Sequence, residues 1–370
     1  MKQILSFVVG VSLVAGAAPA AAGSPGQLGS LIKHAQQVRE ITITEADEIR
    51  IGDAVSQKVR VRYGVVQDAA IHRYVFLVGM ALAQATKRPN LPWTFIVLDT
   101  DGVNAFAAPG GFIHITRGAL ALIANEAELA GVLGHEVTHV TEKHTIKAIQ
   151  KGKMVQVGAD ETLKDSKVFS SLVDKTTDMV MAGFGRAEEL EADHGGVRLA
   201  NSVGYAPGGL AAFLTRLSDR NKSATEKQGL FASHPEMQER LDKLAAIVAD
   251  EKLASTVTLA DRYHRFVSYK PKPQSEIVAV QAGSAGLASG SGTPPKDDDK
   301  KDQPKKHGFG LGSLVKPSGS DQKSAEVTGS GASRGVDTER NAKGGPVSTL
   351  VSVTITPGDL ETFKKEGKLK

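Results

Sequence analysis

Two histidines and a glutamate stand at a spacing suited to metal chemistry in the run Gly134-His135-Glu136-Val137-Thr138-His139. On an α-helix, positions i and i+4 share a face about one turn apart, so His135 and His139 can reach one metal ion. Glu136 projects beside them, where its carboxylate can take a proton from a metal-bound water. The spacing therefore predicts a catalytic metal site, with one Zn²⁺ as the expected ion.

The residues around this run have the periodicity of a buried amphipathic helix. Asn125 is a good N-cap residue, and Glu128 three positions later matches a capping box. Gly131 and Gly134 lack side chains and would let another backbone or a substrate come close. The apolar residues that recur at helical spacing are Leu129, Val132, Leu133, Val137 and Val140. A surface helix with incidental histidines, the ordinary alternative, does not usually carry apolar residues so densely.

A catalytic zinc site needs a third protein ligand and an open position for water. The acidic run Arg186–Asp193 contains Glu189 and Asp193, which are again four residues apart and share a helical face. Glu189 as a ligand would complete a site of two histidines and a glutamate. Asp193 would then bind the outer N–H of a zinc-bound histidine and fix its tautomer. Glu188 and Glu191 remain alternative ligands, and a solvated acidic helix start is the ordinary alternative.

Together these motifs resemble the HtpX, CAAX prenyl protease and BepA family of gluzincin metallopeptidases, in which HExxH is followed by ExxxD on a later helix. The segment Asn104–Ile113 is similar to the family's NAFA-x-PGG hairpin, and Ser233-His234-Pro235, followed by Glu239-Arg240-Leu241, is similar to its SHP segment. The resemblance covers roughly residues 45–247. It implies a mostly helical α+β fold of minigluzincin type, with a small antiparallel sheet beside the HExxH helix.

The resemblance also places His234 over the zinc ion. There it would either donate a hydrogen bond to the developing oxyanion or occupy the fourth position of the zinc and hold the enzyme latent. A histidine at a helix entry without either role is the alternative. His144 lies about 180° around the helix from His135 if that helix continues past it. We therefore expect His144 at the surface or behind the ligands, not as a ligand.

Other elements that would position the site follow from local patterns. Helices are predicted from an N-cap at Thr44, over Ile71–Ala85, Glu188–Asn201 and Leu210–Leu217, and finally over Pro235–Asp250. Trp93–Leu98 alternates like a strand, and Pro109-Gly110-Gly111 predicts a hairpin turn between two further strands. The stretch Asp160–Asp178 has weak periodicity and is expected to be a mobile element near the cleft.

The predicted chemistry is hydrolysis of peptide bonds by water that zinc and Glu136 activate. Asn104–Thr116 would offer an exposed edge strand, along which an extended polypeptide adds by main-chain hydrogen bonds. Loose side-chain preference suits unfolded or misassembled proteins, as in envelope protein quality control. One rival is a periplasmic chaperone or scaffold with structural zinc, which Glu136 argues against. Another is a peptidase for short or lipidated peptides, which fits a chain without a transmembrane helix poorly.

The amino terminus has the layout of a secretory signal peptide, with a positive start at Lys2, an apolar run over Ile4–Ala18 and cleavage after Ala20 or Ala22. The apolar run is short for a membrane span of about 20 residues, and no other stretch qualifies. A periplasmic or secreted protein is expected. The chain has no cysteine, which excludes disulfides and a lipid-modified cysteine, a departure from some family members.

The 370 residues therefore divide into a signal peptide (1–22), a spacer (23–43), a zinc metallopeptidase domain (44–282), a disordered linker (283–345) and a short C-terminal element of unknown role (346–370). In that element Val347–Ile355 alternates like a strand before a Pro357-Gly358 turn. It either docks onto the core or an envelope partner, or is frayed. The net charge is +4, and from Ser284 onward Lys and Arg outnumber Asp and Glu by 14 to 11. The rest is nearly neutral, which does not resemble a nucleic-acid footprint.

Overall fold

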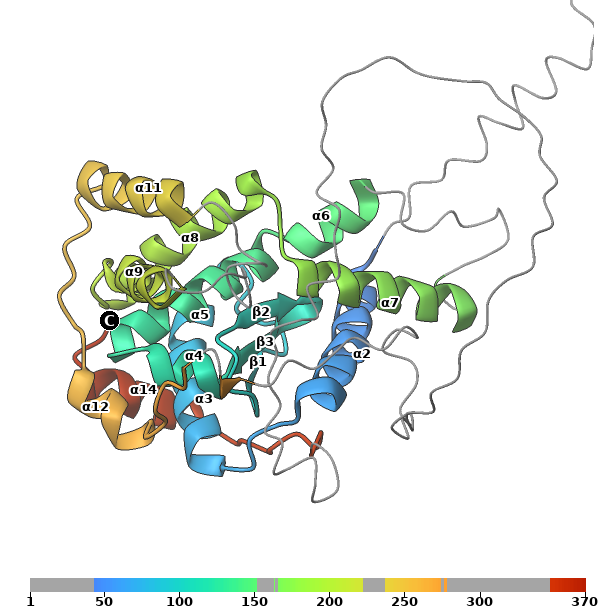
Figure 1. The fold of residues 1–370 in the computed structure, drawn as a ribbon, viewed down its shortest axis with the longest axis horizontal. Helices are drawn as coiled ribbons and strands as arrows, with labels where there is room; N and C mark the ends of the chain where they lie inside the picture. Colours follow the sequence, from blue (N-terminus) through green and yellow to red (C-terminus); the bar gives the residue numbers. More distant parts are fainter. Residues whose placement is uncertain (1–42, 152–162, 164–165, 222–236, 274–275, 278–346) are drawn as a thin grey trace, which may run out of the picture. The chain divides into compact units, whose positions relative to one another are not determined.

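The computed structural model describes residues 43–151, 163, 166–221, 237–273, 276–277 and 347–370 (Figure 1). The predicted signal peptide, nearly all of the spacer, His234 and the predicted linker lie outside the described residues. The helices are α2 (Glu45–Tyr63), α3 (Ala69–Ala83), α4 (Arg117–Leu122), α5 (Glu126–Thr141), α6 (His144–Lys151), α7 (Ser166–Ala182), α8 (Arg186–Val203), α9 (Gly209–Asn221), α11 (Met237–Asp250), α12 (Ala260–Phe266) and α14 (Pro357–Glu366). The strands are β1 (Thr94–Leu98), β2 (Ala105–Ala108) and β3 (Phe112–Thr116), and the short 3₁₀ turn η1 (Pro109–Gly111) lies between β2 and β3.

The predicted α+β class is confirmed, but the small sheet is mixed and not wholly antiparallel. Its strand order is β1-β3-β2. β2 and β3 form the predicted hairpin, whereas β1 runs parallel to β3. The chain returns from β1 along the far side of the sheet as β2, and β3 then fills the space between them. Local turn chemistry predicts the hairpin but contains no information about this insertion.

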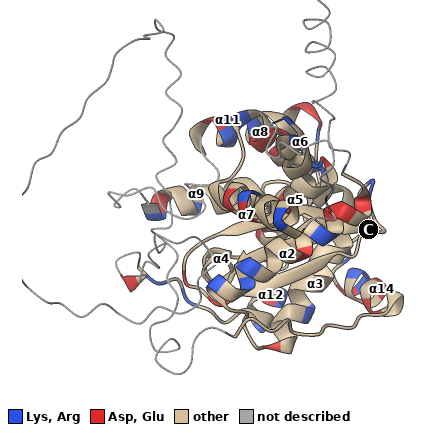
Figure 2. Ribbon diagram, turned by 90° about the vertical axis from the view of Figure 1, so that its right-hand side faces the viewer, with Lys and Arg blue, Asp and Glu red and all other residues tan. Residues whose placement is uncertain are grey.

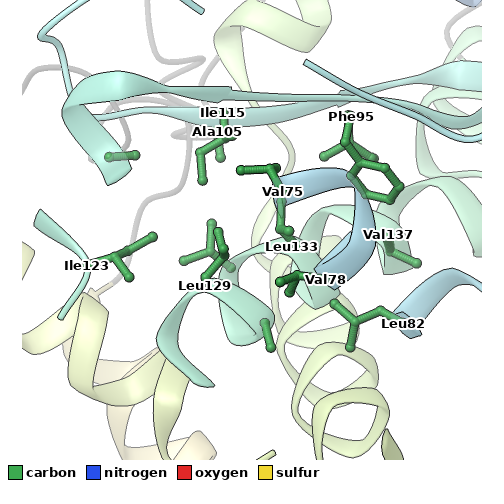
Figure 3. Close-up of a cluster of buried hydrophobic side chains, with 14 of the residues drawn as sticks. Val75, Val78, Leu82, Phe95, Ala105, Ile115, Ile123, Leu129, Leu133 and Val137 are labelled. Carbon is green, nitrogen blue, oxygen red and sulfur yellow. The ribbon is translucent and has the colours of Figure 1, made fainter. Parts of the chain in front are cut away.

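Alternation along the strands divides the core into two clusters, one on each face of the sheet. On one face Ala105 and Ile115 pack with residues of α3 and α5, such as Val75 and Leu133 (Figure 3). On the other face Ile96 and Phe106, among others, pack with residues of α2 and α7. The HExxH helix α5 is therefore packed along the sheet, and all of its residues are buried.

Capping side chains start two helices where the sequence predicts. Thr44 forms a complete capping box with Asp47 at the start of α2. The Asn125 side chain accepts a hydrogen bond from the Glu128 N–H at 3.0 Å, which starts α5. Glu128 does not return the bond to Asn125 N–H but accepts from the Ala124 N–H at 2.9 Å.

The expectation that α5 continues past His144 is wrong. The helix ends at Thr141, Lys143 takes a left-handed conformation with φ of 57°, and α6 begins at His144. Since few residues other than glycine and asparagine adopt this conformation, the sequence carries no warning of the break. The change of direction buries His144, which is 1% exposed. Of its two expected places, the surface and a position behind the ligands, the structure shows the second, next to His139.

Two further expectations need correction. Within Asp160–Asp178, residues from Ser166 onward belong to the regular helix α7, whose Leu172 and Val173 are buried against α2. Val347–Ile355 forms no strand, and Pro357 and Gly358 are the first residues of α14 instead of a turn. No helix among the described residues is long and apolar enough to cross a bilayer.

Charged residues of both signs are interspersed on the described helices (Figure 2). On α11, for example, Glu239 and Asp242 alternate with Arg240 and Lys243. Charges of both signs therefore alternate along this helix.

Candidate metal centre

Helices α5 and α8 are in backbone contact next to the predicted site. A Cβ atom on Gly196 would stand 2.6 Å from the backbone nitrogen of His135, and one on Gly134 would stand 2.9 Å from the carbonyl oxygen of Gly196. Both distances are too short for a real side chain. Gly131 faces the backbone of Leu210 in the same manner, at 2.6 Å. Gly131 and Gly134 of α5 therefore allow the backbones of neighbouring segments to come close. This is one of the two roles expected for them, the other being close approach of a substrate.

The structure brings His135, His139 and Glu189 together, each with one donor atom within 4.8 Å of the others. The Nε2 atoms of His135 and His139 are 3.1 Å apart. Each also lies 3.5 Å from a carboxylate oxygen of Glu189. A tetrahedral ion with ligand bonds of about 2.0–2.1 Å holds its ligand atoms about 3.3 Å apart, so the three donors fit a zinc-sized cation. Among the described residues, no other such group of three is found.

Asp193 lies behind His135, where its Oδ1 is 2.9 Å from Nδ1. Burial alone would lower the pKa of His135, but its hydrogen bonds with Asp193 and Glu189 raise that pKa to about 9. Because Nδ1 is directed to Asp193, Nε2 is the atom left to face the ion. At neutral pH the metal-free imidazole is protonated, so metal binding must release a proton.

A buried arginine from α11 joins Glu189 and Asp193, two of the acidic residues of α8. Arg240 donates from Nε and Nη2 to the Asp193 carboxylate at 2.8 and 2.6 Å, and its Nη1 lies 3.2 Å from Glu189. Burial acts to raise the pKa of Asp193, but hydrogen bonds from Arg240 and His135 lower it. Arg240 thus keeps Asp193 ionised and oriented toward His135.

His139 has an outer partner of its own. Its Nδ1 lies 2.8 Å from Nδ1 of His144, whose Nε2 lies 3.1 Å from Glu191. If His139 donates through Nδ1, His144 accepts at its own Nδ1 and donates from Nε2 to Glu191. One neutral tautomer of His144 therefore satisfies its bonds to both His139 and Glu191. Burial lowers the pKa of His144, in agreement with a neutral ring. Phe184 stacks on His139 with ring centroids 4.2 Å apart.

Glu136 is 1% exposed and lies beside the donors. It lines a small pocket together with His135 and Arg240, and the other lining residues are apolar: Val132, Leu210, Phe213 and Leu214. An apolar environment strengthens electrostatic interactions and favours proton transfer by a nearby carboxylate.

The remaining predicted site residues lie elsewhere. The part of the chain that contains His234 is outside the described residues. Strand β2 is at the sheet edge, but each of its four residues is at most 3% exposed, so the expected exposed edge is not observed. Glu191 approaches His144 and not the three donors, and Glu188 is not in the donor group.

The sequence indicates no role for Arg240 or Phe184, and it does not identify the partners of His144. The only available signal for Arg240 was its place in the run Glu239-Arg240-Leu241 shortly after the SHP segment, because a bond across 47 residues leaves no local pattern. The sequence did not decide between the surface and a position behind the ligands for His144, because the helix break at Lys143 was not foreseen.

Arg240→Met is expected to destabilise the metal-free protein by about 3–5 kcal/mol, since it removes the buried guanidinium that pairs with two buried carboxylates and leaves them only the His135 imidazolium. Arg186→Met is the matched control: Arg186 also pairs with a carboxylate, Glu239, but its side chain is 57% exposed. We expect that change to be below about 1 kcal/mol. Denaturant unfolding of both variants measures the difference, and equal losses would show that Arg240 has no special electrostatic role.

Comparison with known proteins agrees with this geometry. Residues 69–248 match the model of "Peptidase family M48". The β-barrel assembly-enhancing protease of Escherichia coli (strain K12) is 25% identical over 251 residues, which cover 65% of this chain and 51% of that protein. Metalloprotease YcaL from the same organism is 28% identical over 181 residues, covering 48% of this chain and 70% of that protein.

A plant protein is also similar: the mitochondrial metalloendopeptidase OMA1 of Arabidopsis thaliana is 31% identical over 128 residues, 34% of this chain and 26% of that protein. The chain spans about half the length of the β-barrel assembly-enhancing proteases that it matches. The three metal donors lie inside residues 69–248, and so do Glu136, Asp193 and Arg240. The region that carries the metal centre therefore matches the model of peptidase family M48.

Proposed function

We propose that this chain is a zinc-dependent metalloendopeptidase. The observation that carries the proposal is the convergence of three donors, His135, His139 and Glu189, with Glu136 buried beside them. A site that only stabilised the fold would not need a carboxylate next to its ligands. The set of two histidines and a glutamate is the one used by catalytic zinc in peptidases, with a further position open for water.

In this proposal the protein residues position the ion and move protons. When bound, zinc supplies a Lewis acid that polarises a carbonyl and lowers the pKa of coordinated water to about 7. Glu136 accepts the proton of the attacking water and donates it to the leaving nitrogen. Asp193 and His144 orient the two histidine ligands through their outer nitrogens. His234 is proposed, on the family resemblance, to donate to the oxyanion or to hold the enzyme latent.

The proposed substrates are unfolded or misassembled polypeptides outside the cytoplasm. The location rests on the signal-peptide layout of residues 1–22. The substrate class is supported by relatives named β-barrel assembly-enhancing proteases. An extended chain would add to β2, the edge strand of the sheet, by main-chain hydrogen bonds. Because β2 is buried, this binding requires neighbouring elements to move first.

Digestion of an unfolded protein such as casein tests the proposal. We expect cleavage that stops when a zinc chelator is added and returns when zinc is restored. The alternative, a polypeptide-binding chaperone with little or no proteolysis, predicts suppression of client aggregation without cleavage. Intact casein under all zinc conditions would contradict the peptidase and leave the chaperone.

A further inference from the structure

The C-terminal segment, Val347–Lys370, packs against the rest of the described chain although 69 residues (278–346) separate it from the preceding described part. At its start, the Val65 N–H donates to the carbonyl of Val347 at 2.7 Å, just after α2. At its end, the Lys370 N–H donates to the carbonyl of Val203 at 2.7 Å, at the end of α8. In Figure 1 it is the red part of the ribbon, with α14 near α12 and α3.

Side chains of α14 complete the core on this side. Phe363 is 7% exposed, and its ring meets the ring of Tyr74 edge-on with centroids 6.4 Å apart. The guanidinium of Arg262 lies 4.0 Å from the centre of the Phe363 ring, a cation–π geometry. Arg73 donates to Asp359 at 2.8 Å. Ile355, Leu360 and Leu369 pack against the same hydrophobic cluster as α5.

Arg262 connects this segment with the first residue of α5. Its Nη1 donates to the carbonyl of Phe363 at 2.9 Å, and its Nε donates to Glu126 at 2.7 Å. Glu126 is fully buried and also accepts from Tyr74 and Tyr205, at 2.8 and 2.7 Å. Without the C-terminal segment, Arg262 would lose both an acceptor and the ring that shields its charge from water, at the point where it holds the start of α5.

The other contact is at the end of α8. Besides the bond from Lys370 to Val203, the Cα atom of Leu369 lies 3.5 Å from where a Cβ atom of Gly204 would be. The C-terminal segment therefore contacts the last residue of α8 directly and reaches the first residue of α5 through Arg262. Helix α5 carries His135 and His139, and helix α8 carries Glu189. These are the two helices whose relative position brings the donors together.

We propose that the C-terminal segment is an intramolecular clamp on the two metal-bearing helices, α5 and α8. Docked on Arg262 and Val203, it holds the helices in the register that places Glu189 opposite the two histidines, and its loss weakens metal binding. The inference rests on the proposed metal centre but not on proteolysis. Since only non-covalent contacts within the described residues hold the segment in place, a separate peptide of the same sequence should occupy the same surface.

The test compares the full-length protein with a variant that lacks residues 347–370. We expect the shortened protein to bind zinc about tenfold more weakly in competition with a chromogenic chelator and to melt about 10 °C lower without metal. Deletion of residues 290–335, which retains the C-terminal segment, should change neither quantity. Adding a peptide of residues 347–370 should restore both values, whereas the same peptide with Phe363→Ala should not.

Two full-length variants decide the matter if the shortened protein does not fold. Phe363→Ala should reduce zinc affinity and melting temperature in the same direction, whereas Glu361→Ala, at a side chain that is 72% exposed on the same helix, should change neither. The clamp would be overturned if the shortened protein and Phe363→Ala both bound zinc as tightly as the wild type. If the shortened protein does not fold, wild-type zinc affinity in Phe363→Ala alone would overturn it. Absence of proteolysis in the intact protein, with these zinc effects present, would overturn only the proposed function.

Discussion

Glu136→Gln is expected to reduce peptide hydrolysis by about 10²–10⁴-fold while zinc content stays at that of the wild type. The amide has nearly the same size as the carboxylate but cannot accept the proton of the attacking water. Since Glu136 is not among the three donors, its loss should leave the ion in place. Casein digestion combined with metal analysis of the same sample measures both quantities.

Glu142→Gln is a matched control for this experiment. Glu142 lies at the end of the same helix and pairs with Lys87 at 2.7 Å, away from the donors. The control should retain both activity and zinc. Hydrolysis at the wild-type rate by the Glu136 variant would require another general base and would contradict the proposed mechanism.

Glu189→Ala is expected to lower zinc affinity by more than about 100-fold, beyond what loss of an outer partner usually causes. The substitution removes the anionic member of the three proposed ligands. It also leaves the guanidinium of Arg240, which lies 3.2 Å from the Glu189 carboxylate in the wild type, to repel the incoming cation. Zinc titration against a chelator of known affinity measures the change. Purified protein should also contain little metal.

The other two glutamates of the same turn provide controls. Glu188→Ala and Glu191→Ala should keep zinc, although Glu191→Ala removes the outer partner of His144 and should weaken binding somewhat. Full zinc occupancy in Glu189→Ala, with loss in either control, would transfer the ligand role to that residue.

Local signals in the sequence predicted the parts of the site that depend on helix periodicity and turn chemistry. The spacing of His135 and His139 and that of Glu189 and Asp193 each placed two side chains on one helical face, and the structure brings both faces together. The Asn125 cap and the Pro109-Gly110-Gly111 turn acted through neighbouring backbone groups, so a window of a few residues contained all that was needed.

The features that were missed depend on contacts between distant segments. A lysine at position 143 has no intrinsic preference for the left-handed conformation that follows the end of α5, so its local sequence does not predict the break. Val347–Ile355 alternates like a strand, but a strand needs a neighbouring strand to pair with, and the sequence could not show that none is formed there. The role of Arg240 likewise appears only after α11 packs against α8.

The contact between Gly134 and Gly196 has a consequence for how the metal is acquired. Backbone touches backbone at this point, so no rotamer change can alter the separation of α5 and α8. The ligands on the two helices are thus pre-organised, and little conformational entropy remains to be lost when an ion enters. Alanine at either glycine would push α5 and α8 apart and increase the distance between Glu189 and the two histidines. A single methyl group at this contact would therefore be enough to disturb the ligand geometry.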